Sequence, residues 1–300
     1  MSDTIRTGTK FAPQNLTPEE LIEYTPEWTG ERSADGRPRV GDDLLARLRA
    51  VTITQAWTVL RNDGFHWQYE GGWICTHPGQ VLVGRALTAL YMPRRPDMRD
   101  VMERKGAALG CVGDQISWPI DLLAPGDVYV ADVFGKIAQG PVIGDNLATA
   151  IYARSGNGVV HDAAVRDIDG LRELPGFTSF VRGTDPSFAS PTIMLTGCNT
   201  PIRIGGVTVM PGDAVLGRPD GVIFVPPHLV ERVVKTSELI QLRDAFGKSR
   251  LAEGVYTSGQ IDRQWSDDIE ADFSVWLEDH IDELTVPREA IQVLLQERTW

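Results

Sequence analysis

The sequence has few cysteines and no long apolar run. Its three cysteines, Cys75, Cys111 and Cys198, are an odd number without the spacing of a metal site, which is typical of reduced thiols and predicts a cytoplasmic protein. No run approaches the roughly 20 apolar residues of a membrane span, and the polar first residues lack the apolar segment of a signal peptide. We therefore expect no membrane partner.

Basic residues are also scarce relative to acidic ones. The chain has 29 Lys and Arg against 41 Asp and Glu, so its formal net charge is −12. A nucleic-acid partner would require a basic face, and we expect no such partner. The same charge repels an anionic substrate, so a local arginine or metal ion must capture it.

The signatures of several enzyme classes are missing. The five histidines lack His-x-His or His-Glu-x-x-His spacing, which argues against a zinc site. There is no Gly-x-Ser-x-Gly nucleophile elbow and no phosphate-binding Gly-x-x-x-x-Gly-Lys-Ser/Thr loop. His161 precedes Arg166 by five residues, and we expect it to face the core.

What remains is typical of a globular α/β protein. Apolar residues make up 42% of the chain and charged residues 23%. Strands alternate with helices early and form hairpins late, which predicts mixed β-sheets in two layers flanked by helices. We expect an N-terminal extension over residues 1–40, an α/β domain over 41–246 and a C-terminal helical extension over 247–300. The acidic tail is expected to contact other subunits.

Local signals place the elements. Thr17 to Glu20 reads as a capping box, and Gly205-Gly206 between two β-rich runs predicts a hairpin. The aromatic segment of residues 65–73 is expected to be a loop, which either packs locally, contacts another subunit or covers a site. Helices are predicted over residues 42–49, 52–62, 97–109, 169–174, 227–246, 267–284 and 287–297. Strands are predicted over residues 81–92, 128–133, 158–160, 179–181, 193–195, 202–204, 207–209, 214–216 and 222–225.

One stretch, residues 144–183, carries the candidate chemistry. Gly144 and Asp145 open an apolar-periodic run, which predicts a helix that begins with Asp145 or Asn146 as N-cap and ends near Ser155. The unpaired amides and positive dipole end at such a terminus suit a carboxylate or phosphate. A turn and a buried strand follow, and after them come Arg166 and Asp167, whose carboxylate could bind a metal ion. The plainer interpretation is a surface ion pair beside an ordinary helix cap.

Several motifs in order strengthen the first interpretation. Twenty residues separate Asp145 from Arg166-Asp167, giving a D-x20-R-D pattern. Residues 158–167 (GVVHDAAVRD), 180–183 (FVRG), 209–213 (VMPGD) and 220–226 (DGVIFVP) complete the set. Over roughly residues 40–245 the chain resembles the RraA-like family. That family includes class II pyruvate aldolases, which act on 4-hydroxy-4-methyl-2-oxoglutarate and 4-carboxy-4-hydroxy-2-oxoadipate, and the regulator of ribonuclease E activity.

Two departures from the family accompany the match. Gln55-Ala56-Trp57 stands where the family usually has Asp-Ala-Leu, and Arg218 stands where it usually has Asp. The second change is expected to alter an ion pair or a subunit contact.

The resemblance implies an αββα swivelling fold, a homotrimer or homohexamer, and sites between subunits. It also implies roles for single residues. Asp167 would bind Mg²⁺ or Mn²⁺, which would be chelated by a 2-oxo acid substrate. The substrate carboxylate would lie beyond Gly144 on the amides of Asp145, Asn146 and Leu147. Arg166 would hold the keto oxygen, and Asp145 would orient a water that moves the proton.

The implied reaction is retro-aldol cleavage of a 4-hydroxy-2-oxo acid to pyruvate and a second carbonyl acid. Oxaloacetate decarboxylation needs the same enolate stabilisation and should accompany it. Two other functions remain open. One is a sugar-acid dehydratase or hydratase on the same site, and the other is a non-catalytic regulator that binds a ribonuclease or helicase.

Overall fold

The structure, a computed structural model, describes residues 16–280. The chain divides into two compact units, one up to Val230 and one from Glu231 onward. The predicted domain boundary at residue 246 falls inside the helix Val230–Ala252. The helix predicted over 287–297 and the end of the one predicted over 267–284 lie outside the described residues. None of the helices in the described part combines the length and apolar character that crossing a membrane requires.

The first unit contains most of the strands and several short helices. Its helices are α1 (Pro18–Tyr24), α2 (Asp42–Leu48), α3 (Ile53–Asn62), α4 (Pro96–Ala108), η1 (Pro119–Leu122), α5 (Asp145–Ser155), α6 (Ile168–Arg172) and η2 (Pro227–Leu229). Its strands are β1 (Tyr69–Glu70), β2 (Ile74–Cys75), β3 (Leu82–Pro93), β4 (Asp127–Lys136), β5 (Val159–Val165), β6 (Ser179–Thr184), β7 (Ile193–Cys198), β8 (Ile202–Ile204), β9 (Val207–Val209), β10 (Ala214–Arg218) and β11 (Gly221–Val225).

The main sheet is mixed, as the sequence predicts. Its nine strands run in the order β1-β11-β10-β3-β4-β5-β6-β2, with β7 also paired to β3. The strands β3, β4, β5 and β6 are parallel, and the others pair antiparallel. The predicted glycine turn joins β8 and β9 into a separate two-stranded hairpin. The prediction of an α/β fold with a mixed sheet and flanking helices is confirmed.

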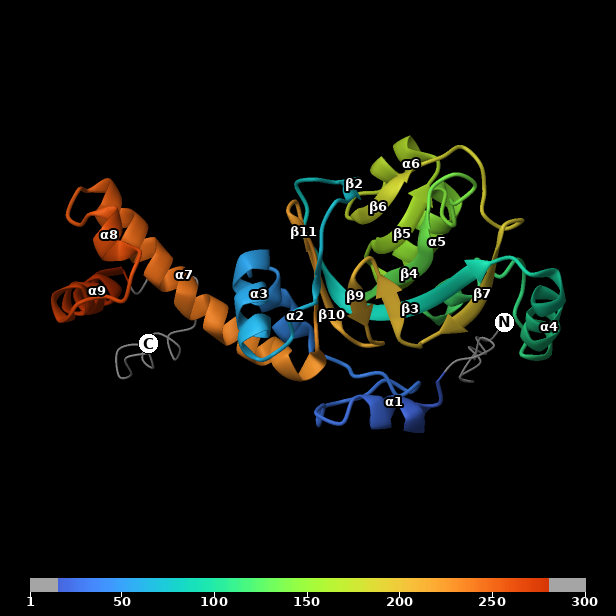
Figure 1. The fold of residues 1–300 in the computed structure, drawn as a ribbon, viewed down its shortest axis with the longest axis horizontal. Coiled ribbons are helices and arrows are strands. Elements are labelled where there is room, and N and C mark those ends of the chain that lie inside the picture. Colours follow the sequence, from blue (N-terminus) through green and yellow to red (C-terminus); the bar gives the residue numbers. More distant parts are fainter. Residues whose placement is uncertain (1–15, 281–300) are drawn as a thin grey trace, which may run out of the picture. The chain divides into compact units, whose positions relative to one another are not determined.

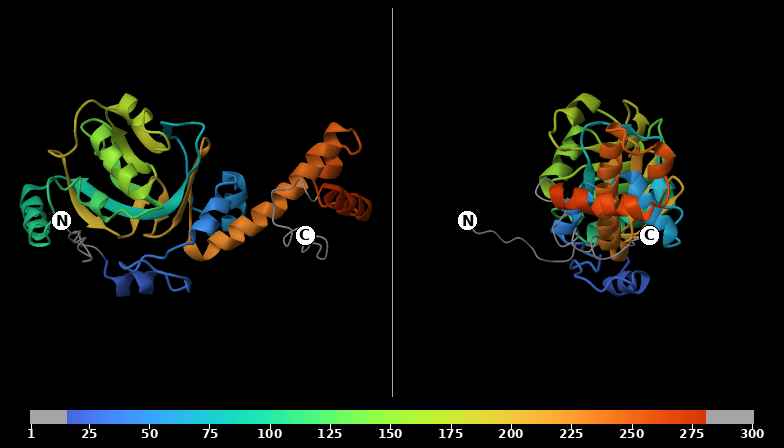
Figure 2. Two further views of the ribbon diagram at one scale, coloured as in Figure 1. Left: turned by 180° about the vertical axis from the view of Figure 1, so that it is seen from behind. Right: turned by 90° about the vertical axis from the view of Figure 1, so that its left-hand side faces the viewer.

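The sheet is strongly curved, and one short segment connects its two ends (Figures 1 and 2). β1 pairs with β11 at one end of the strand order, and β2 pairs with β6 at the other. Only residues 71–73 separate β1 from β2. Across the interior, a Cβ atom built on Gly217 of β10 would lie 2.5 Å from the ring of Phe180 on β6. The aromatic segment predicted as a loop therefore includes a strand and links the two ends of the sheet.

Arg182 fixes this connecting segment. Its guanidinium donates to Asp162 Oδ1 at 2.7 Å, to the Gly71 carbonyl at 2.7 Å and to Glu70 Oε1 at 2.6 Å. It also lies 3.7 Å from the ring centroid of Trp73. Trp73 thus packs locally against Arg182. Local packing is one of the three roles, with subunit contact and covering a site, that the sequence leaves open for these aromatic residues. A single arginine ties β5 and β6 to the segment between β1 and β2.

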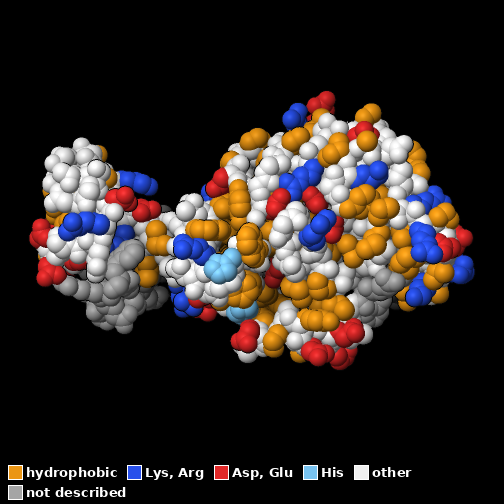
Figure 3. Space-filling model, viewed as in Figure 1, with side chains coloured by type: hydrophobic (Ala, Val, Ile, Leu, Met, Phe, Trp, Pro, Cys, Tyr) orange, Lys and Arg blue, Asp and Glu red, His pale blue; other side chains and the backbone are white. Residues whose placement is uncertain are grey.

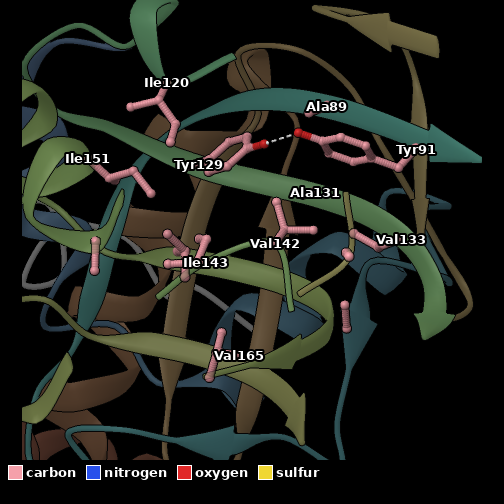
Figure 4. Close-up of a cluster of buried hydrophobic side chains, with 14 of the residues drawn as sticks. Ala89, Tyr91, Ile120, Tyr129, Ala131, Val133, Val142, Ile143, Ile151 and Val165 are labelled. Atoms are coloured by element: carbon pink, nitrogen blue, oxygen red, sulfur yellow. Dashed lines mark hydrogen bonds between the residues drawn. The ribbon is translucent and has the colours of Figure 1, made fainter. Parts of the chain in front are cut away.

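Two apolar cores lie on opposite faces of the sheet. The inner one gathers residues of β3 to β6, β10 and β11 with the β8–β9 hairpin. The outer one lies between the parallel strands and α5, α6 and η1, and it contains a hydrogen bond of 3.0 Å between the hydroxyls of Tyr91 and Tyr129 (Figure 4). His161 is fully buried here, edge-on to Tyr129 at 4.9 Å. The prediction that His161 faces the core is confirmed.

Two buried arginines attach the N-terminal segment to this same unit. Arg37 donates to Asp127 Oδ2 at 3.0 Å and to Asp35 Oδ2 at 2.8 Å. Arg85 of β3 donates to the Val40 carbonyl and to Asp42 Oδ1, both at 2.7 Å. The segment predicted as an extension therefore contacts the α/β core of its own chain.

Breaking the first of these pairs should destabilise the protein strongly. In Arg37→Met, Asp127 stays 3% exposed and loses its cation, so the free energy of unfolding should fall by about 3–5 kcal/mol. Urea unfolding measures the change. Arg39→Met is the matched control, because its exposed pairs with Glu31 and Asp42 should contribute about 1 kcal/mol or less. Equal losses in the two variants would contradict the prediction.

Asp213 should make stability depend on pH. Burial raises the pKa of Asp213 to about 7. The hydrogen bond that Asp213 accepts from the Met210 N–H lowers the pKa, but by less than burial raises it. An unfolded aspartate titrates near 3.9, so between about pH 4 and 7 the folded state binds more protons and this contribution to stability falls as pH rises. Burial lowers the pKa of His161 to about 3, so the contribution of His161 to stability rises with pH up to about pH 6.5.

Comparing wild type with Asp213→Asn isolates the contribution of Asp213. From pH 5 to 7.5 the variant's melting temperature should rise relative to that of wild type. A constant difference would contradict this.

The second unit is helical. It consists of α7 (Val230–Ala252), α8 (Ser258–Ile261) and α9 (Asp267–His280). Its core is aromatic, with the ring of Phe246 within 6 Å of the rings of Trp265, Phe273 and Trp276. Arg243 stacks over Trp265 at 3.7 Å. The role in subunit contacts predicted for this tail stays a prediction.

Candidate active site

The parallel crossover from β4 through α5 to β5 builds the candidate site. In such a unit the helix begins beyond the carboxyl end of the first strand, which is the same sheet edge at which the second strand ends. The amino end of α5 and the residues after β5 therefore meet at one edge. A backbone hydrogen bond of 3.1 Å from Arg166 N–H to the Ile143 carbonyl holds the two segments together. The start of α5 and the Arg166-Asp167 pair, which are about 20 residues apart in the sequence, therefore lie close together in space.

Gly144 is the point of closest approach. A Cβ atom at this position would lie 2.5 Å from Asp167 Oδ2 and 2.9 Å from Arg166 Nε. Arg166 Nε and Asp167 Oδ2 are 3.3 Å apart. The structure thus brings Gly144, Arg166 and Asp167 into contact, as the sequence predicts, and any side chain at residue 144 would displace the two charged groups.

The helix N-cap differs from the prediction. Gly144, and neither Asp145 nor Asn146, is the N-cap of α5, and its carbonyl accepts the Ala148 N–H at 2.9 Å. Gly144 has an extended backbone, with φ of −120° and ψ of −172°, so helical dihedrals begin at Asp145, and the missing side chain of Gly144 leaves room for Asp167. Asp145 is the first helical residue, and its Oδ1 accepts the Asn146 N–H at 2.7 Å. The amides of Asp145, Asn146 and Leu147 belong to the first turn, which leaves them without intrahelical partners.

Asp167 has an unusual backbone. It adopts a left-handed conformation with φ of 55° and ψ of 43°, which aspartate and asparagine tolerate better than most residues. It is also the N-cap of α6, which begins at Ile168, one residue before the predicted start at residue 169. β5 ends at Val165 and α6 begins at Ile168, so Arg166 and Asp167 form the whole turn between them. This turn places the carboxylate next to Gly144 instead of continuing the strand.

Both charged groups are open to solvent on the single chain. The Arg166 side chain is 42% exposed and that of Asp167 is 47% exposed. Within residues 16–280 no three His, Cys, Asp or Glu side chains form a group that suits a metal ion. A metal here would take one protein carboxylate, Asp167. On the face drawn in Figure 3, basic and acidic side chains lie interspersed.

Sequence reasoning missed one neighbour of the site. Gly170 lies in α6, and a Cβ atom there would be 2.8 Å from Asp145 Cβ and 3.3 Å from its Oδ2. The only sequence signal is a glycine inside a predicted helix, where alanine would be more favourable. Because Gly170 has no side chain, α6 can pack directly on Asp145.

The sequence is similar to those of known proteins. Residues 60–224 match the RraA-like family model, described as Aldolase/RraA. The chain is 33% identical over 132 residues to a putative 4-hydroxy-4-methyl-2-oxoglutarate aldolase of Halalkalibacterium halodurans, covering 44% of this chain and 61% of that one. It is 31% identical over 143 residues to the 4-hydroxy-4-methyl-2-oxoglutarate aldolase of Thermus thermophilus, covering 48% and 74%. The match thus spans less than two thirds of the first of these relatives.

A solved structure agrees with the sequence matches. Streptomyces coelicolor RraAS2, described as an unusual member of the RNase ES inhibitor RraA protein family, is similar with a TM-score of 0.57 and 25% identity. The similarity covers 71% of this chain and 98% of that one. The family model covers more than half of the sequence, and its range includes the whole Gly144–Arg166–Asp167 cluster. The chain belongs to the RraA-like family.

Proposed function

We propose that this protein is a divalent-metal-dependent lyase that cleaves a 4-hydroxy-2-oxo acid to pyruvate and a second carbonyl acid. Oxaloacetate decarboxylation is its expected side activity. The observation that carries the proposal is the contact of a guanidinium and a carboxylate with the amino end of α5, at Gly144. The aldolase names of two relatives support the same reaction class.

The residues present fit a magnesium or manganese ion at Asp167. Such ions prefer oxygen ligands, and magnesium usually keeps several waters beside one or two carboxylates. One half-exposed carboxylate matches that demand. When bound, the ion would supply Lewis acidity to a 2-oxo acid. Asp167 is the residue that would hold it.

The amino end of α5 suits the substrate carboxylate. Helix N-termini bind anions through free amides and the helix dipole. The Asn146 amide already donates to Asp145 Oδ1, so the Asp145 carboxylate occupies part of this anion-binding position. An incoming carboxylate would use the amides of Asp145 and Leu147 and would compete with Asp145 for that of Asn146. Asp145 would then turn toward the reacting atoms.

Arg166 and Asp145 would carry the chemistry of the chain itself. Cleavage leaves a pair of electrons on the pyruvate fragment, and the resulting enolate bears its negative charge on oxygen. A fixed guanidinium beside that oxygen lowers the barrier because the charge develops where a cation already lies. Asp145, packed under Gly170, would hold a water through which the proton moves. Leu147 contributes its backbone amide.

The exposure of Arg166 and Asp167 on one chain supports a site completed by another subunit. We propose a homotrimer or homohexamer, with this sheet edge at the subunit boundary. The C-terminal helices from Glu231 onward are an additional element available for such contacts. Sedimentation velocity of the full chain tests the oligomeric state.

Gly144→Ala should lower turnover without unfolding the protein. The new methyl group would lie 2.5 Å from Asp167 Oδ2 and must displace it, and a shift of about 1 Å at a reacting centre costs on the order of 100-fold in rate. Pyruvate release measures the loss. The control is Gly41→Ala, because Gly41 is also a helix N-cap but a methyl group added there would meet no atom within 4 Å. Equal turnover of the two variants would contradict the proposed geometry.

The function itself is tested by a substrate screen. The full chain should release pyruvate from oxaloacetate and from 4-hydroxy-4-methyl-2-oxoglutarate with Mg²⁺, and a chelator should stop both reactions. Dehydration of sugar acids with no cleavage of 2-oxo acids would favour a dehydratase on the same site. A folded protein with no turnover at saturating metal would favour a regulator, the role for which the family of the Streptomyces protein is named.

A further inference from the structure

Arg218, which departs from the family pattern, lies beside a second arginine. It ends β10, and its Nη2 donates to the Arg49 carbonyl at 2.6 Å. Arg49 is the C-cap of α2, and its Nη1 donates to the Val81 carbonyl at 2.5 Å. The two arginines therefore meet where α2 ends and β3 begins, and both are anchored on backbone carbonyls.

The arginines at this corner lack the usual anionic partners. Arg49 is exposed and Arg218 partly buried, whereas the more buried arginines Arg37, Arg85 and Arg182 each pair with a carboxylate. In the described part of the chain, neither Arg49 nor Arg218 forms an ion pair with Asp or Glu. The Nε atom of Arg218 is buried and has no hydrogen-bond partner. Positive charge at this corner is thus left without a counterion from residues 16–280.

A polar cavity adjoins Arg49. Its volume is about 390 Å³, and no carboxylate is among its lining residues. Gln80 lines it and accepts the Thr178 hydroxyl on Oε1 at 3.0 Å, which leaves its amide nitrogen as a donor. Asn157 also lines it, with one N–H of its amide donating to the Val83 carbonyl at 3.0 Å. The side-chain donors that remain are those of Arg49 and Gln80 and the second N–H of the Asn157 amide.

The cavity is separate from the proposed active site. It lies where β3 and β6 begin and α5 ends, between Leu82, Gly156 and Thr178. Arg166 and Asp167 follow the opposite end of β5. An occupant of the cavity would therefore not occupy the retro-aldol site.

We propose that this cavity binds a small oxyanion, a phosphate or a short carboxylate, with Arg49 as its principal contact. A guanidinium presents two parallel donors that match the oxygens of either group. Gln80 adds a neutral donor, and Arg218 adds positive charge while holding the backbone of Arg49. In a chain of net charge −12, such a local pair of cations is what retains an anion.

Calorimetric titration of the full chain tests the proposal, with inorganic phosphate and malonate as separate probes and NaCl at matched ionic strength as the blank. Arg166→Gln, in which the proposed active site loses its cation, should bind both probes like wild type. Arg49→Gln should weaken binding by about 10- to 100-fold, the range for hydrogen bonds to a charged group. Arg94→Gln is the control, because the exposed side chain of Arg94 donates, within residues 16–280, only to the Pro191 carbonyl at 3.4 Å.

A second variant guards against misfolding of the first. Gln80→Glu leaves both arginine–backbone bonds intact and places a carboxylate in the cavity, so it should abolish binding of either probe. Tighter phosphate binding would identify a phosphate-type ligand, and tighter malonate binding a carboxylate-type one. Binding that depends on Arg166 instead of Arg49, or no binding above the NaCl blank, would overturn the proposal. Neither result bears on whether the protein releases pyruvate.

Discussion

Replacing Asp167 with alanine is expected to abolish the metal-dependent release of pyruvate from oxaloacetate. Asp167 is the carboxylate beside Gly144 and Arg166 that is proposed to hold the ion. Loss of the ion removes several kcal/mol of transition-state stabilisation, which corresponds to a rate at least about 1,000-fold lower. Initial rates measured over a range of Mg²⁺ concentrations should stay at the background level, and added metal should not restore them.

Asp169→Ala provides the matched control. Asp169 lies in the first turn of α6, its side chain is 94% exposed, and its distance of 3.8 Å from Arg172 makes a weak surface pair. Its removal should leave the rate within about twofold of wild type. Binding of Mn²⁺, followed by electron paramagnetic resonance, gives a second readout and should be lost only in Asp167→Ala. Full activity of Asp167→Ala would refute the metal assignment.

Replacing Arg166 with methionine is expected to lower kcat by about 100- to 1,000-fold, the cost of removing one preorganised group that stabilises a developing oxyanion. The guanidinium lies against Asp167 and Gly144, and methionine keeps much of its length without its charge. Mn²⁺ affinity should change little, because Arg166 is not a proposed ligand. The kinetic constants for oxaloacetate, measured at saturating Mg²⁺, report the change.

Two further variants separate charge from geometry at this position. Arg166→Lys keeps the charge but loses the planar fork, so it should recover part of the rate lost in Arg166→Met. Arg172→Met, on the next helix and 54% exposed, should behave like wild type. Should Arg166→Met raise KM alone and leave kcat unchanged, Arg166 would bind the substrate in its ground state only.

Local signals predicted much of this structure. The capping box predicted at Thr17 begins α1, the helix predicted from residue 52 begins with Thr52 as its N-cap, and Gly205-Gly206 turns between β8 and β9. These features depend on residues within one turn or one hairpin, where each preference acts directly on the backbone. The meeting of the amino end of α5, at Gly144, with Arg166 and Asp167 was also predicted, because a β-α-β crossover of that length puts both at the same edge of the sheet.

Features that depend on residues far apart in the chain could not be predicted from local sequence patterns. The Arg182 bonds to Asp162, Glu70 and Gly71 span 20 to 112 positions, and no local pattern specifies such partners. The close approach of Asp167 to Gly144, the N-cap of α5, likewise joins residues that are distant in sequence and close in space. Gly170 was missed for the same reason, since its value lies in the space it leaves for Asp145.

The short link between β1 and β2 bears on how this protein avoids self-association. Exposed sheet borders offer unpaired amides and carbonyls to neighbouring molecules, and proteins counter this with very short outer strands, charges or coverings. Here both outer strands of the main strand order have two residues each, and they belong to one continuous segment. A stretch of seven residues, 69–75, therefore supplies both outer strands of this order, and we expect a change in that segment to uncover the edges of β11 and β6 together.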